Sequence, residues 1–137
     1  MDTGKSALGL DGNVAAALGY PIPLIAIISL IMEKENRFVK FHALQSILIQ
    51  VAFIVVAVVL MFLFFILAIF GIAASAAGGE AAGAVSGIFG LLISLIWMVV
   101  IAAFVGGLIY AAVKAYGGNK LMLPVIGAMA DKWTGGN

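Results

Sequence analysis

Two long apolar runs without a charged residue constrain this chain more than any other feature of its sequence. Residues 43–74 and 84–113 contain no Asp, Glu, Lys or Arg, and the first run has no Gly or Pro before Gly71. A helix of about 20 residues already crosses the ~30 Å hydrocarbon core of a bilayer, since each residue adds about 1.5 Å. Both runs are therefore predicted to be transmembrane helices, and the length of the first implies tilt or a protruding end.

A third apolar run at residues 14–32 has the length of one further span. The whole chain is 65% hydrophobic and 9% charged, which is too little polar surface for a water-soluble domain. We expect a single all-α membrane domain over residues 1–137, with transmembrane helices at about 14–32, 43–74 and 84–113. A cleaved signal peptide at the first run is disfavoured, because the charged residues 33–35 follow it directly.

Pro21 and Pro23 interrupt the first run near its middle. Each proline lacks an amide hydrogen and its ring clashes with the preceding helical turn, so this helix is predicted to kink or break there. A broken helix exposes backbone groups to substrates or ions, as in transporters. The alternative is a structural kink whose freed backbone groups are satisfied by neighbouring helices.

Positive charge is distributed unevenly between the loops. The loop before the second run carries Lys34, Arg37 and Lys40, the loop after it carries no Lys or Arg, and three lysines follow the third run. By the positive-inside rule, the first loop and the C-terminus are expected in the cytoplasm and the N-terminus outside. The expected location is the inner (plasma) membrane, crossed several times.

The segment at about 121–133 is too short to span a bilayer, because only residues 121–130 are free of charge. It is predicted to be a short interfacial helix on the inner face, and a re-entrant segment is the alternative. Lipid headgroups are the expected contacts of the basic and aromatic side chains that flank the apolar runs. These are Lys34, Arg37, Lys40, Lys120, Lys132 and Trp133.

A polar stripe enters the second run where it leaves the charged loop. It consists of His42, Gln45, Ser46 and Gln50, which fall on one face of a helix. One hypothesis is a polar vestibule, open to the cytoplasmic side, that holds a peptide, an ion or a proton. The other is hydrogen bonding between helices that fixes their register, and it is favoured because no membrane-embedded acid accompanies the stripe.

Several functional classes are disfavoured by composition. The chain has no Cys and one His, so no catalytic residue, cofactor site or metal site is assigned, and an enzyme is not expected. A formal net charge of +1 gives no reason to expect a nucleic-acid partner. Small residues recur at intervals of four in the third run, as in Gly83 with Gly87, which favours close helix packing within the chain or between subunits.

Four blocks, at residues 13–20, 33–46, 114–118 and 123–127, resemble a family of small prokaryotic membrane proteins. That family is related to the twenty-kilodalton component of the chloroplast inner-envelope import translocon. The resemblance implies a helical membrane domain and no particular reaction. We therefore expect a non-enzymatic accessory or scaffold subunit, in contact with membrane lipid and packed in a homo- or hetero-oligomeric complex. A translocation or transport component is the alternative.

Overall fold

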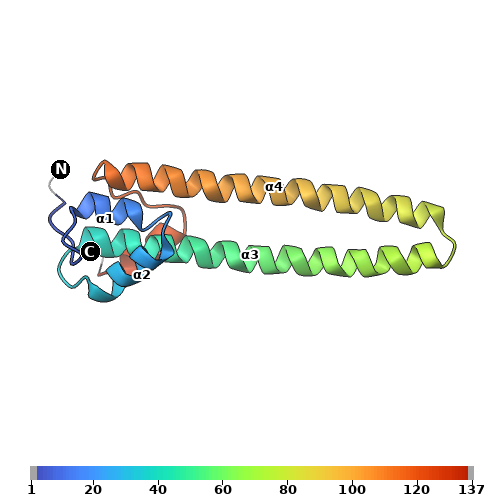
Figure 1. Cartoon of the computed structure of the whole chain (residues 1–137), viewed down its shortest axis with the longest axis horizontal. Helices are drawn as coiled ribbons and strands as arrows, with labels where there is room; N and C mark the ends of the chain where they lie inside the picture. Colours follow the sequence, from blue (N-terminus) through green and yellow to red (C-terminus); the bar gives the residue numbers. More distant parts are fainter. Residues whose placement is uncertain (1–2, 136–137) are drawn as a thin grey trace. The chain divides into compact units, whose positions relative to one another are not determined.

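The computed structural model describes residues 3–135, and this part of the chain is helical without strands. The helices are α1 (Gly12–Leu18), α2 (Pro23–Met32), α3 (Arg37–Ala76), α4 (Glu80–Tyr116) and α5 (Ile126–Trp133) (Figure 1). Within the described residues, α3 and α4 are the two helices long and apolar enough to cross a membrane. The prediction of an all-helical fold is confirmed, and the second and third apolar runs form long apolar helices as expected.

The third span is not confirmed, because the first apolar run forms two short helices. Helix α1 has 7 residues and α2 has 10, and neither reaches the roughly 20 residues that a spanning helix needs. Residues 19–22 separate them, and Pro23 is the first residue of α2, where a missing amide hydrogen costs nothing. The two prolines therefore produce a break between helices rather than a kink within one.

Both long helices extend beyond the predicted boundaries. The second span was predicted at 43–74 and the third at 84–113, whereas the structure continues α3 from Arg37 to Ala76 and α4 from Glu80 to Tyr116. Helix α3 begins early because the Asn36 side-chain oxygen accepts a hydrogen bond from the Val39 amide at 3.2 Å, as an N-cap does. Charged residues in the first turn do not prevent the helix, because Arg37 is exposed and Lys40 half-buried, while Val39 between them is buried.

The described chain forms two compact units. One comprises residues up to Ala52 together with those from Phe104 onward, and the other is Phe53–Ala103. We call them the head unit and the hairpin unit. The expectation of a single domain stays a prediction.

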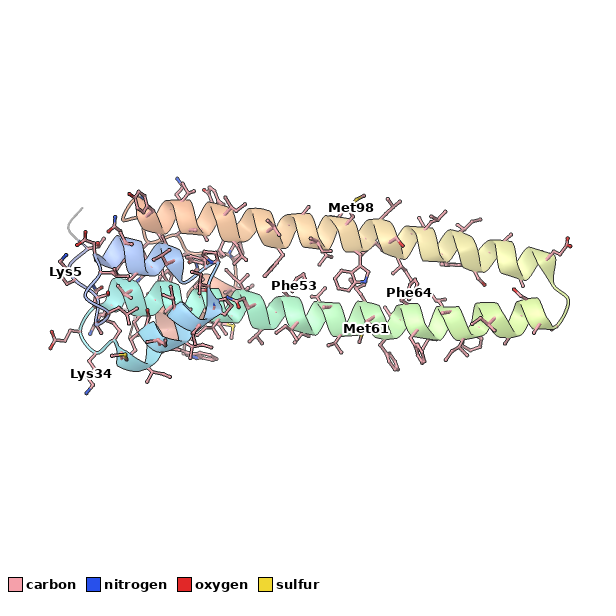
Figure 2. All side chains as sticks on the ribbon, viewed as in Figure 1. Lys5, Lys34, Phe53, Met61, Phe64 and Met98 are labelled. Carbon is pink, nitrogen blue, oxygen red and sulfur yellow. The ribbon has the colours of Figure 1, made fainter. Side chains whose placement is uncertain are left out.

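The hairpin unit consists of the second part of α3 and the first part of α4, joined by a turn at residues 77–79 (Figure 1). Gly78 takes a positive φ of 87°, which side chains rarely tolerate. The two helices approach closely at Gly71, where an added Cβ would lie 2.8 Å from the Ser86 side chain. Further along, the ring of Phe53, labelled in Figure 2, meets the Trp97 ring edge to face, with 6.4 Å between the ring centroids.

The head unit has two small hydrophobic clusters. In the first, Ala16 and Tyr20 pack against Ala111 and Ala115 of α4. In the second, Phe41 and Leu44 of α3 pack against Ala130 of α5, with Leu30 of α2 beside them. Helix α5 is therefore seated on α3 through one face, which the interfacial interpretation of residues 121–133 did not foresee.

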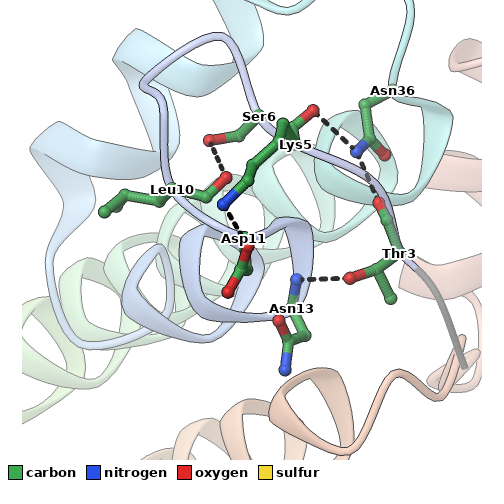
Figure 3. A network of polar contacts seen from close by, with 7 residues as sticks. All are labelled: Thr3, Lys5, Ser6, Leu10, Asp11, Asn13 and Asn36. Carbon is green, nitrogen blue, oxygen red and sulfur yellow. Dashed lines mark hydrogen bonds and ion pairs between the residues drawn. The ribbon is translucent and has the colours of Figure 1, made fainter.

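Residues 3–13 are held against the charged loop that precedes α3. The side-chain amide of Asn36 donates to the backbone carbonyls of Thr3 at 2.7 Å and Lys5 at 3.2 Å, as Figure 3 shows. The Ala7 amide donates to the buried Glu33 carboxylate at 2.8 Å. Because these contacts are direct, residues 3–7 and the loop at 33–36 lie side by side. The expectation of an N-terminus outside and this loop in the cytoplasm stays a prediction.

Candidate functional site

The polar stripe lies at the centre of the head unit, where it meets the break between α1 and α2. His42 Nδ1 and the Tyr20 hydroxyl are 2.8 Å apart, and the Gln45 side-chain amide donates to the same hydroxyl at 2.8 Å. His42 and Gln45 are 0% exposed and Tyr20 is 1% exposed. His42, Gln45 and Tyr20 thus form a continuous hydrogen-bonded network that is buried from solvent.

The partner atoms define which tautomer His42 adopts. Its Nε2 lies 3.2 Å from the Asn119 carbonyl oxygen, which can only accept, so Nε2 carries the hydrogen. Nδ1 is then free to accept from the Tyr20 hydroxyl, whose oxygen in turn accepts from Gln45. The rings of Phe38 and Phe41 pack edge-on against the imidazole, at 4.6 and 5.1 Å between centroids, and exclude water from it.

Ser46 binds the broken backbone of the first apolar run, and Gln50 binds Ser46. Ser46 Oγ donates to the Gly19 carbonyl at 2.7 Å and accepts from the Gln50 side-chain amide at 3.1 Å. Since Pro23 has no amide hydrogen, it cannot donate to the Gly19 carbonyl four residues before it, as a residue inside a continuous helix does. The hydroxyl of Ser46 supplies the missing donor.

The segment between α4 and α5 reaches the same network from the other side. Gln45 Oε1 accepts from the Leu123 amide at 3.4 Å. An added Cβ on Gly127 would lie 2.7 Å from Met122 Cα and 2.9 Å from Gln45 Oε1, so only glycine fits here. Between these residues Val125 takes a φ of 64°, which is strained for a β-branched side chain. Gln45 is thus the point where both irregular segments meet.

This arrangement favours structural hydrogen bonding over catalysis or metal binding. The polar side chains of the stripe all have partners, and among residues 3–135 no group of three or more His, Cys, Asp or Glu side chains is placed to hold a metal ion. His42 is held by an aromatic cage and two fixed partners, with no carboxylate hydrogen-bonded to it. An open vestibule would require these contacts to separate.

The side chains predicted to contact lipid headgroups are placed differently from one another. Lys34, Lys132 and Trp133 are exposed, and Lys40 is half-buried. The exposed Arg37 donates to the Gly135 carbonyl at 3.1 Å, which ties the end of the α5 segment to the start of α3. Lys120 pairs with Asp131 and lies 5.0 Å from the centre of the Phe41 ring, so its charge is used within the head unit.

Sequence reasoning missed three members of the site. Tyr20 was not singled out as a site residue, and neither the Asn119 carbonyl nor the Leu123 amide carries a side-chain signal. Glu33 was assigned to an exposed loop, although it is buried and accepts from the Ala7 and Asn36 amides. A tyrosine directly before Pro-x-Pro was the one available hint of Tyr20's role.

Known proteins with similar sequences are membrane proteins. A UPF0132 membrane protein of Methanocaldococcus jannaschii is 33% identical over 132 residues, which cover 96% of each chain. A UPF0132 membrane protein of Archaeoglobus fulgidus is 34% identical over 125 residues, covering 90% of this chain and 96% of its own. No solved structure matches the chain.

The relatives confirm the expected likeness to small prokaryotic membrane proteins. A sequence model of the Magnetosome magnetite crystal formation protein family matches residues 7–130. The matched region begins in the N-terminal segment that contacts Glu33 and ends within α5. The chain therefore belongs to the Magnetosome magnetite crystal formation protein family.

Proposed function

We propose that this chain is a non-enzymatic subunit of an integral membrane complex, assembled with copies of itself or with other membrane proteins. In this proposal the hairpin unit crosses the bilayer. Each helical arm of the hairpin unit, 53–76 and 80–103, is about 36 Å long at ~1.5 Å per residue, which is sufficient for the ~30 Å core.

The glycines of α4 carry this proposal, because they divide into two sets. Gly83 faces α3, where an added Cβ would lie 3.1 Å from the Ser75 hydroxyl. Gly87 and Gly90 have open space where a Cβ would stand. With Gly71, these residues line a groove of about 480 Å³ in the hairpin unit. Small residues left open on a membrane helix allow the close approach of another helix.

We infer an orientation from the contacts of the head unit. Because residues 3–7 are bonded to the loop at 33–36, the N-terminus, this loop and the C-terminal segment share one side of the membrane. The loop carries Lys34 and is followed by Arg37 and Lys40, so this side is the cytoplasm in our proposal. Glu80 and the turn before it then lie outside.

Translocation through a polar vestibule is the alternative, and the geometry supports it less well. A vestibule needs His42, Gln45 and Ser46 to face water, whereas all three are 0% exposed and hydrogen-bonded. The double variant His42→Ala with Gln50→Leu tests this alternative in reconstituted vesicles. Loss of flux with the fold preserved would favour transport over the proposal.

Purification in mild detergent followed by native mass measurement tests the proposed subunit role. The wild-type chain is expected in a complex, and Gly90→Leu is expected to weaken that complex by filling the open groove. Ala103→Leu is the matched control, since it places the same side chain on an exposed position about 140° around α4. A wild-type monomer without a co-purifying protein would overturn the proposal.

A further inference from the structure

Helix α2 presents an apolar face that nothing in the head unit covers. Leu24, Ile27 and Ile31 recur at helical spacing and are 64%, 44% and 74% exposed. The opposite face is packed, since Ala26 and Ser29 are buried. In water such a face would be unfavourable by about 25 cal/mol for every Å² of apolar surface left exposed.

Helix α5 and the residue before it repeat this arrangement. Val125 and Trp133 are 73% and 61% exposed, and Met129 lies between them on the same side. The inward face again consists of small buried residues, Gly127 and Ala130. Two separate helices of the head unit therefore leave an apolar face without a protein partner.

The two helices lie on the same side of α3. Leu30 of α2 and Ala130 of α5 both pack against the cluster formed by Phe41 and Leu44. Those two α3 residues are three positions apart and share one helix face. The outward faces of α2 and α5 consequently point away from α3. In a helix that spans a membrane, lipid lies in this direction.

Helices α1 and α2, with the turn between them, run along α3 and back. At the turn between the two helices, Ser46 donates to the Gly19 carbonyl. Just after α2, the Glu33 carboxylate accepts from the backbone amide of Asn36, the residue before α3. Between positions 36 and 46 α3 rises about 15 Å, which equals the length of the ten-residue α2.

The segment from Leu123 to Gly135 likewise runs along α3 and back. It reaches Gln45 through the Leu123 amide and returns to Arg37 through the Gly135 carbonyl. Eight positions of α3 separate these contacts, about 12 Å, which is the length of the eight-residue α5. Both segments therefore turn back at the level of Gln45 and Ser46.

Charge in the head unit follows the same geometry. Within the described residues, α1, α2, their connecting turn and residues 121–130 carry no charged side chain. The charges lie before, between or after these parts, and they are Lys5, Asp11, Glu33, Lys34, Glu35, Arg37, Lys40, Lys114, Lys120, Asp131 and Lys132. An apolar layer bordered by basic residues and Trp133 matches the boundary between acyl chains and headgroups.

We propose that α1 with α2, and the segment from residue 119 to α5, are two re-entrant elements that enter one leaflet just below its headgroups, with the outward faces of α2 and α5 in contact with lipid acyl chains. The stripe on α3 satisfies the irregular backbone at the turning points, because no water does so at that depth. This inference rests on the proposal that the hairpin unit crosses the membrane.

Spin labels on the otherwise cysteine-free full chain test the inference in vesicles of phosphatidylethanolamine and phosphatidylglycerol. Leu24→Cys, Ile31→Cys and Met129→Cys place labels on the two apolar faces, and Lys34→Cys is the water-exposed control. Collision with oxygen reports lipid, and collision with a water-soluble nickel chelate reports water. The oxygen-to-nickel ratio is expected to be several-fold higher at position 24 than at 34, and to fall from 24 to 31.

Each outcome decides the matter. Equal ratios at 24 and 31 would mean that α2 lies flat at the surface, and high nickel accessibility at 24 and 129 would mean that these faces meet water. Low values for both reagents would mean that protein covers them, as at an interface between copies. All three overturn the inference. A label at Leu91 in the hairpin unit reports separately on the proposed membrane crossing.

Tryptophan fluorescence provides a second measurement without a label on α2. The chain has two tryptophans, so Trp97→Phe leaves Trp133 as the single emitter, and Trp133→Phe leaves Trp97 in the hairpin unit. Nitroxide lipids labelled near the headgroup are expected to quench Trp133 more strongly than those labelled deep in the acyl chain. Absence of quenching at Trp133 by either lipid would contradict insertion of α5.

Discussion

Gln45→Leu is the substitution that most directly tests the buried network. Leucine is close in size to glutamine and keeps the helix, so the change removes hydrogen bonds more than volume. Gln45 donates to the Tyr20 hydroxyl at 2.8 Å and accepts from the Leu123 amide at 3.4 Å. After the substitution the Leu123 amide has no acceptor, and the Tyr20 oxygen loses its donor.

The magnitude follows from these two contacts. Hydrogen bonds between membrane helices average about 0.6 kcal/mol, whereas a buried donor left without a partner costs about 1–3 kcal/mol. The expected loss for Gln45→Leu is therefore about 2 kcal/mol, or roughly a thirty-fold lower ratio of folded to unfolded protein. Gln50→Leu is the matched control, because half-buried Gln50 makes one side-chain contact, to Ser46, and should cost about 0.6 kcal/mol or less.

Unfolding in mixed micelles of mild detergent and dodecyl sulfate, followed by tryptophan fluorescence, measures the difference between these variants. Hydrogen exchange locates the effect, since the Leu123 amide should lose protection in Gln45→Leu before the amides of the hairpin unit do. Equal stability of the two variants, with unchanged protection at Leu123, would refute the view that Gln45 holds the C-terminal segment.

Two further predictions concern orientation and close packing. Single cysteines at Lys5 and Glu35 are expected to react with an impermeant maleimide from one face of the membrane, and a cysteine at Gly79 from the other; different faces for 5 and 35 would contradict the head unit. Gly127→Ala is expected to lower the free energy of unfolding by about 1–3 kcal/mol, because its Cβ meets backbone, whereas Gly106→Ala enters open space and should be neutral or stabilising in the same unfolding assay.

The two long helices were predictable because charge-free runs of this length have few other solutions, and because the break at Pro21 and Pro23 follows from local chemistry. The return of the chain after that break was not. Two prolines are equally compatible with a kinked span and with two antiparallel short helices, and the choice depends on whether Gly19 finds a donor at Ser46, a contact across 27 residues.

The early start of α3 and the fold-back of α5 were missed for related reasons. Asn36 within a charged stretch was interpreted as part of a loop, although Asn is a preferred N-cap and its side chain here caps α3. The packing of α5 on α3 relies on Gly127 and Ala130, and small residues mark a close approach without saying which element approaches.

The pattern of the polar stripe makes physical sense once it is compared with the backbone groups that the irregular segments leave without helical partners. Three such groups reach the stripe, namely the Gly19 carbonyl, the Asn119 carbonyl and the Leu123 amide. Three stripe residues meet them in turn, Ser46, His42 and Gln45, which are also the three that are fully buried. Gln50 binds no backbone group and is only half-buried. Polar residues at the end of an apolar helix are commonly weighed as a pore or a binding site. Where broken segments pack nearby, the number of backbone groups to be satisfied accounts for the stripe without a ligand.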